Sequence, residues 1–149
     1  TEVDENDDTT NADDEGIFTI EFDVTAFGDD IYLPFGASTT NAASVTDLND
    51  AFNFVILDNN NAIVTATPGQ LTISVDVDDS DTEETNSYKV DEGDTETFTL
   101  EVTFDPTAAD SYKVRLDSVN FALTDVALAT KAQDVSDLDI DTAKLTIQN

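Results

Sequence analysis

Residues 16–26 read GIFTIEFDVTA, and this stretch decides what kind of fold the chain can form. Its apolar side chains from Phe18 to Ala26 fall on every second residue, with threonine or a carboxylate between them. Successive side chains of a β-strand point to opposite faces of the sheet, so this spacing places the apolar ones on one face. We therefore predict a long strand that is buried on one face and exposed to solvent on the other.

The same period of two returns along the chain, with turn residues at intervals of roughly ten positions. Helices that could cross over between parallel strands are missing from the pattern. We therefore predict an all-β fold, an antiparallel β-sandwich of about eight or nine strands. The expected strands lie at 16–27, 31–35, 52–57, 62–67, 71–77, 88–90, 98–104, 112–123 and 145–147.

Three stretches depart from this alternation. Residues 36–50 are rich in Ala, Ser, Thr and Asn and predict a loop, with at most one helical turn at 44–49. Residues 124–136 have a helix-like composition but fit a long loop equally well. The alternation slips between Leu116 and Val119, which predicts a β-bulge at Asp117–Ser118.

The length of 149 residues suits one domain with a core of its own. We assign this single β-sandwich domain to residues 16–149, where the apolar alternation is found. Residues 1–15 are acidic and polar and predict a flexible N-terminal arm or linker. A second interpretation stays open, in which this arm becomes ordered only against a neighbouring subunit.

The balance of charge is extreme. The chain carries 34 Asp and Glu residues against 5 Lys and Arg, which gives a formal net charge of -29. Such a chain lacks the cations that bind nucleic-acid phosphates, and anionic lipid would repel it. No apolar run approaches the roughly 18 residues of a membrane-spanning helix, so we expect no direct membrane insertion. The charge can keep the protein soluble, be screened by salt, or be partly neutralised by divalent cations.

The first residue is Thr1 rather than methionine, which suggests a processed segment that has lost a signal peptide or an anchor. We therefore expect an extracellular location at a cell surface. The absence of cysteine does not oppose this location, because a domain large enough to build a core can omit disulfides.

The residue types for most catalytic chemistry are missing. Histidine and cysteine are both absent, which excludes Ser-His-Asp and Cys-His catalysis and also Cys/His zinc sites. Paired carboxylates can hydrolyse glycosidic bonds, but among 34 acidic residues some pair falls at a suitable separation by chance. We therefore expect that the chain is not an enzyme.

Calcium is the cofactor that the carboxylates favour, because Ca²⁺ binds hard oxygen ligands. Two acidic clusters carry such ligands, although neither matches an EF-hand loop. The second cluster also has the spacing of an ordinary strand, with carboxylates on one face and Leu138 and Ile140 on the other. The candidate ligands are Asp76, Asp78, Asp79 and Asp81, with Glu83 and Glu84, in the first cluster, and Asp137, Asp139 and Asp141 in the second.

Three segments resemble the closing hairpin of bacterial immunoglobulin-like surface domains: 90–94 (VDEGD), 97–102 (TFTLEV) and 110–116 (DSYKVRL). The opening strand at 16–27 also looks like that of domains in secreted surface proteins. The resemblance implies an immunoglobulin-like β-sandwich of secreted cell-surface proteins. It also implies that Tyr112 forms a tyrosine corner, in which its hydroxyl bonds to the backbone a few residues upstream.

Some pilin sandwiches contain an intramolecular Lys–Asn crosslink, which needs a buried lysine beside an asparagine and an acid. The lysines in expected strands are Lys89, Lys113 and Lys144, and the candidate partners are Asn53 and Asn120. No spacing in the sequence sets that geometry.

Two functions remain open. The first hypothesis is a structural subunit of an extracellular filament or surface layer, which assembles with copies of itself or other surface proteins through strand contacts. The alternative is a monomeric adhesive or spacer module of a larger surface protein. A polymer needs a terminal strand from a neighbour, either 1–27 or 143–148, to close its sheet, whereas a module closes its own sheet. The net charge predicts that any self-assembly depends on salt or calcium.

Overall fold

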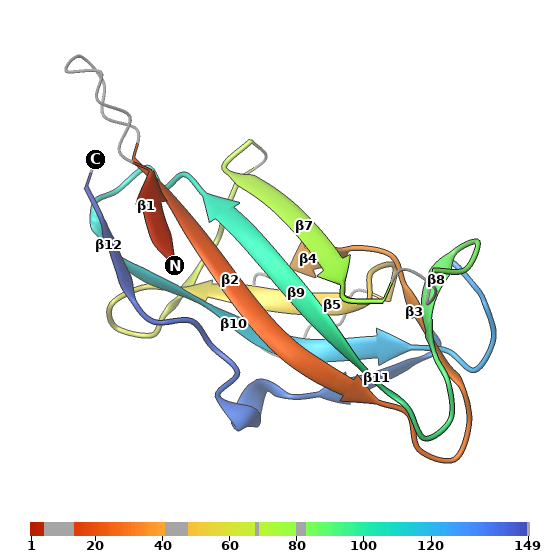
Figure 1. Ribbon diagram of the computed structural model, residues 1–149. Helices are drawn as coiled ribbons and strands as arrows, with labels where there is room; N and C mark the ends of the chain where they lie inside the picture. The colour runs from red at the N-terminus through yellow and green to blue at the C-terminus, as the bar shows by residue number, and fades with distance from the viewer. Residues whose placement is uncertain (5–13, 41–47, 68, 80–82, 149) are drawn as a thin grey trace.

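The strands pack as two layers, and the predicted all-β class with antiparallel sheets is confirmed (Figure 1). The computed structural model describes residues 1–4, 14–40, 48–67, 69–79 and 83–148. Among these residues, the short 3-10 helix η2 (Ser136–Leu138) is the helical element. The two layers enclose the core, as expected of a β-sandwich.

The first layer is a four-stranded antiparallel sheet in the order β1-β2-β9-β7. β2 pairs with β9 along its length, whereas β1 pairs only with residues 15–17 at the start of β2. Residues 2–4 of the predicted arm therefore form a strand, while residues 5–13 lie outside the described residues. The bounds are β1 (Glu2–Asp4), β2 (Glu15–Thr25), β7 (Leu71–Val77) and β9 (Thr95–Phe104).

The second layer is built around β10. One edge of β10 pairs with β5, which in turn pairs with β4 and β6, and the other edge pairs with β11 and β12. A two-stranded sheet of β3 and β8 lies at one end of the sandwich (Figure 1). The bounds are β3 (Ile31–Pro34), β4 (Ala37–Thr39), β5 (Phe52–Leu57), β6 (Ile63–Val64), β8 (Ser87–Val90), β10 (Asp110–Phe121), β11 (Lys131–Asp134) and β12 (Leu145–Ile147).

The core consists of the apolar faces that the alternation predicted. Phe18 of β2, Phe98 of β9 and Phe52 of β5 are fully buried. The Phe22 and Phe52 rings meet edge to face with 5.0 Å between centroids, and the Phe52 and Phe98 rings lie 5.2 Å apart. Burying one such side chain stabilises a fold by about 1.5–3 kcal/mol. Contacts of this kind must stabilise a chain that has no cysteine for disulfides.

β5 is buried on both faces, which the alternation does not predict. Phe52 faces the core, and Asn53 lies on the opposite face in a buried polar network. The Ser118 hydroxyl donates to the Asn53 side-chain oxygen at 3.2 Å, and the Asn53 amide donates to the Ser38 hydroxyl at 3.1 Å. Buried polar groups need such partners. The network therefore links β4, β5 and β10 on that face.

The bulge predicted at Asp117–Ser118 is confirmed, because the register between β10 and β5 shifts between Leu116 and Ser118. Two loop predictions are wrong in part. Residues 37–39 form β4, which pairs parallel to β5, and residues 131–134 form β11 on the edge of β10. Such short pieces bring the described strands to twelve, where eight or nine were expected. A period of two cannot be recognised in so few residues.

The last part of the chain runs along β10 as an interrupted strand. β11 pairs with residues 118–121 and β12 with residues 110–112. Between them, the Leu116 amide donates to the Ile140 carbonyl and the Thr142 amide donates to the Val114 carbonyl, both at 2.9 Å. Ile147 of β12 is completely buried. The chain thus closes this edge of its second sheet with its own terminal segment.

Tyr112, near the start of β10, makes the hydrogen bond expected of a tyrosine corner. Its hydroxyl donates to the carbonyl oxygen of Ala108 at 2.7 Å, four residues upstream. Its ring meets Phe104 edge to face with 5.2 Å between centroids. These contacts tie the β9–β10 connection to the strand that follows it.

We expect Tyr112→Phe to lower the free energy of unfolding by about 1 kcal/mol, because the variant keeps the ring and loses one hydrogen bond. Urea unfolding followed by circular dichroism measures this difference. Tyr32→Phe is the matched control, since no hydrogen bond joins the Tyr32 hydroxyl to a described residue. Equal losses in both variants would mean that the Ala108 contact adds no stability.

Candidate functional site

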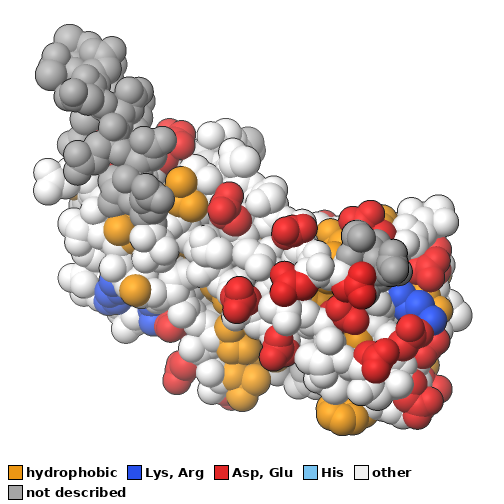
Figure 2. All heavy atoms as spheres, in the orientation of Figure 1, with side chains coloured by type: hydrophobic (Ala, Val, Ile, Leu, Met, Phe, Trp, Pro, Cys, Tyr) orange, Lys and Arg blue, Asp and Glu red, His pale blue; other side chains and the backbone are white. Residues whose placement is uncertain are grey.

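The outward face of the first sheet is a candidate interaction surface, lined by hydroxyls and carboxylates. The strand register places Thr99 between Glu21 of β2 and Asp76 of β7, with Glu101 in the next row. Figure 2 shows carboxylates across this face and Lys or Arg side chains only toward its ends. The face therefore presents a negative surface that favours cations or a basic partner.

The first predicted calcium cluster is spread along the end of β7. Asp76 lies within the strand and is exposed, and the Asp78 amide donates to the Thr97 carbonyl at 3.1 Å. Asp78 and Asp79 follow the strand, whereas Asp81 lies outside the described residues. On the far side of the gap, Glu83 forms an isolated bridge with Tyr88. Burial, then the Glu83 and Asp76 carboxylates, raise the pKa of the Tyr88 hydroxyl.

A different acidic group gathers around Glu96 of β9, and the sequence reasoning missed it. Burial raises the pKa of the Glu96 carboxyl above its ordinary value, and the nearby carboxylates of Asp79, Asp94, Asp91 and Asp78 raise it further. Glu96 shares the phase of Phe98 and Leu100 on β9, so it points to the inner side of the sheet. The alternation in the sequence already placed Glu96 on the same face as Phe98. It could not show that Asp78 and Asp79 lie near the 91–94 turn, because this depends on the pairing of β7 with β9.

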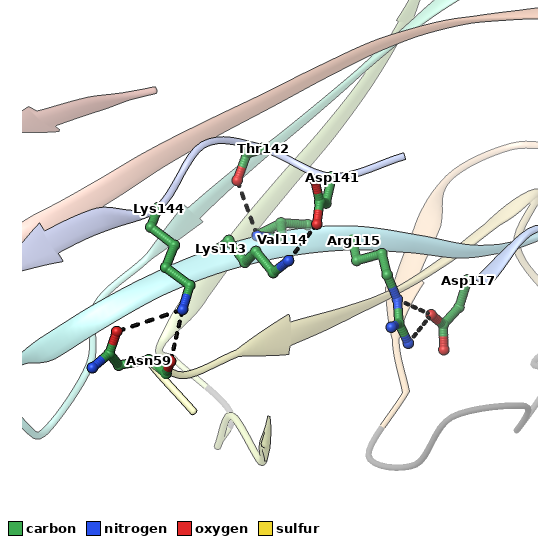
Figure 3. A network of polar contacts seen from close by, with 8 residues as sticks. All are labelled: Asn59, Lys113, Val114, Arg115, Asp117, Asp141, Thr142 and Lys144. Atoms are coloured by element: carbon green, nitrogen blue, oxygen red, sulfur yellow. Dashed lines mark hydrogen bonds and ion pairs between the residues drawn. The ribbon is translucent and has the colours of Figure 1, made fainter. Parts of the chain in front are cut away.

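The second predicted cluster does not have the extended conformation that its spacing suggested. Asp137 lies in the 3-10 helix η2, and Asp139 has the left-handed backbone angle φ of 51°. Asp141 is engaged in an ion pair with Lys113 (Figure 3). The alternative interpretation of this cluster as an ordinary strand, with all three carboxylates on one face, is therefore not what the structure shows. The helical turn at 136–139 interrupts the extended backbone, so the alternation of side chains between two faces is lost.

Three of the basic side chains gather on or beside β10 (Figure 3). Arg115 donates to the Asp117 carboxylate from Nε at 3.0 Å and from a terminal nitrogen at 2.9 Å. Lys144 donates to the Asn59 carbonyl oxygen at 2.7 Å. Asp117 is buried at the bulge with 4% of its surface exposed, so its charge relies on the Arg115 pair.

The residues considered for a Lys–Asn crosslink do not meet in the expected pairs. Lys113 pairs with Asp141, and Lys89 pairs with Asp30 and Asp91. Asn53 and Asn120 instead hydrogen bond to each other and to Ser118 in the buried network, with 3.3 Å between the Asn120 amide nitrogen and the Asn53 oxygen.

A metal centre would need several ligands that converge. Within the described residues, no group of three or more Asp or Glu side chains is placed to hold a metal ion. The negative field, rather than a coordination sphere, is therefore the main electrostatic feature of the described surface. Ordered calcium binding stays a prediction.

Comparisons with known proteins identify no relative. No family model, no curated protein and no solved structure matches the chain. Among the described residues, no helix is both long and apolar enough to span a membrane.

We expect Glu96→Gln to raise the melting temperature at pH 7. The folded state holds the Glu96 proton more tightly than the unfolded state does, so the ionised carboxylate costs stability above the unfolded pKa of about 4.3. The gain should disappear at about pH 3, where both states are protonated.

Glu101→Gln is the control for this experiment, because Glu101 is exposed on the same strand and its removal reports the general effect of losing one negative charge. Thermal unfolding at both pH values compares the variants. Equal gains for Glu96→Gln and Glu101→Gln at pH 7 would show that the environment of Glu96 adds nothing of its own.

Proposed function

We propose that the chain is a self-contained, non-catalytic module of an extracellular surface protein, with an immunoglobulin-type sandwich as its scaffold. The observation that carries this proposal is the closure of the second sheet by β12, whose Ile147 is completely buried in the core of the same chain. A subunit that polymerises by strand donation would leave that place for a neighbour. Closure within the chain favours the module.

The strand order supports the immunoglobulin-type assignment. In chain order, β1, β2, β5, β7, β9, β10 and β12 take the places of strands A to G. The first sheet then has the order A-B-E-D, and β5, β10 and β12 form the C-F-G sheet, as in constant-type domains. Tyr112 near the start of the F-equivalent strand adds to this argument.

The charge supports a module whose copies stay separate from one another. A formal net charge of -29 keeps copies apart at low ionic strength. Both ends of the chain lie toward one end of the sandwich, where β12 approaches β1 (Figure 1). The opposite end, with β3, β8 and the connection from β10 to β11, is thus free to face a partner.

The structural subunit of a filament or surface layer is the second candidate, because one specific feature favours it. Within the described residues, no strand pairs with the outer edge of β2 beyond Ile17. An open edge of this length is a template for a further strand. Salt or Ca²⁺ would have to screen the charge before copies could pair there.

We expect Ile147→Ala to destabilise the isolated chain by about 3 kcal/mol, because it removes buried methyl groups and leaves a cavity. The loss should be the same at all protein concentrations, since β12 belongs to its own core. Urea unfolding at two widely separated protein concentrations measures this. A midpoint that rises with concentration would show that the strand comes from a neighbour and would overturn the module.

The assembly state under ions separates the two candidates. For the module, we expect one monomeric species by light scattering, and single particles by electron microscopy, in NaCl and in CaCl₂ of matched ionic strength. Matching the ionic strength separates screening from calcium binding. Filaments or sheets that form in CaCl₂ and dissolve in chelator would instead support the structural subunit and calcium as its assembly ion.

A further inference from the structure

An apolar hollow lies between the two sheets at the end of the open edge of β2, beside residues 23–27. Its volume is about 350 Å³, and its apolar lining includes Val24, Ile31, Val119, Phe121 and Val135. Phe27 also lines it and has 86% of its surface exposed. Figure 2 shows apolar side chains that reach the surface along the lower edge of the view. The two sheets are therefore not sealed against solvent on this side.

The backbone of β2 is ready to pair at the same edge. The Ala26 amide donates to the Asp94 carbonyl at 3.1 Å, so residues in phase with Ala26 bond toward β9. In an antiparallel ladder the alternate residues direct their backbone groups to the other side. These are Thr19, Glu21, Asp23 and Thr25, and no described strand pairs with them on that side.

A strand added at this edge must have a definite pattern of side chains. Every second side chain would point to the inner side of the sheet, where the hollow beside Val24 and Phe121 at one end favours an apolar group. The others would continue the outer face, beside Glu21 and Asp23, where a basic side chain is favoured.

The charge argues against a second copy as the added strand. If two β2 edges paired antiparallel about Phe22, Glu21 of one copy would lie opposite Asp23 of the other. Like charges in directly opposed positions destabilise a sheet. With 34 acidic and 5 basic residues, the chain also has little of its own that could supply alternating cations.

We propose that the open edge of β2 and the adjoining hollow bind an extended segment of a different protein, in which basic and apolar residues alternate. The segment adds a strand to the first sheet, covers the hollow and neutralises part of the acidic outer face. Main-chain hydrogen bonds hold the strand, and the hollow and the carboxylates select its side chains.

The probe is a capped synthetic peptide of about seven residues, with lysine and valine in alternation, which matches the length of the open edge. A peptide of the same composition with the lysines and valines in separate blocks is the matched control, since it carries equal charge and cannot direct its valines to one face. Titrations at about 0.15 M NaCl, followed by amide NMR of the unmodified chain, limit non-specific attraction. We expect saturable shifts at Thr19 to Thr25 for the alternating peptide alone.

Glu21→Pro tests the edge itself, because proline removes an outward amide and leaves the ladder with β9 intact. Glu21→Thr is its control, since both variants lose the same charge and only the proline blocks pairing. We expect about tenfold weaker binding to Glu21→Pro than to Glu21→Thr. Circular dichroism checks that both variants fold. If the proline variant does not fold, the amide NMR shifts of the unmodified chain with the two peptides test the proposal.

Three results would overturn the proposal: equal binding of the alternating and block peptides, shifts spread over the acidic face without the β2 edge, or equal affinity of the two variants. Dimers of the chain that protect the β2 amides in the absence of peptide would likewise overturn it, in favour of a second copy. None of these results depends on Ile147, whose substitution tests the module. The module proposal can therefore fail or stand independently of this one.

Discussion

The pairing of the final segment of the chain with β10 is the contact on which the second sheet depends. β10 holds β5 on one side, and on the other side residues 130–147 are the part of the described chain that pairs with its backbone groups. The bulge at Asp117 and the helical turn at 136–139 adjust the two strands to each other. Because Ile147 enters the core at the end of this segment, pairing and burial stabilise the same closure.

The second constraint is that almost all of the charge must stay in water. The outward-facing positions of β2, β7 and β9 can carry carboxylates because water hydrates each carboxylate there. Few cations are present to pair with them. Among the described residues the buried Asp117 is the exception, and it meets Arg115. At the end of the sandwich, Lys89 bridges Asp30 and Asp91, and the pKa of Asp30 is lowered by the Glu92 amide and by Lys89.

These two constraints meet at the open edge of β2. A long unpaired edge beside an apolar hollow is normally an aggregation hazard, and proteins protect such edges with charge. Glu21 and Asp23 provide that protection against copies of the same chain, because self-pairing would oppose like charges. The same carboxylates attract a basic strand, so one set of side chains both prevents self-association and selects a partner.

The sequence by itself determined the layers of this protein. The period of two in residues 18–26 and 98–104 settled which side chains are buried, because a strand has only two faces, and the slip after Leu116 located the bulge. The tertiary structure decided which strands are neighbours. The short β4 and β11, the carboxylates around Glu96 and the hollow beside Val24 all depend on contacts between residues far apart in the chain. Local periodicity cannot specify such contacts, since the same alternating pattern fits every strand position in the sandwich.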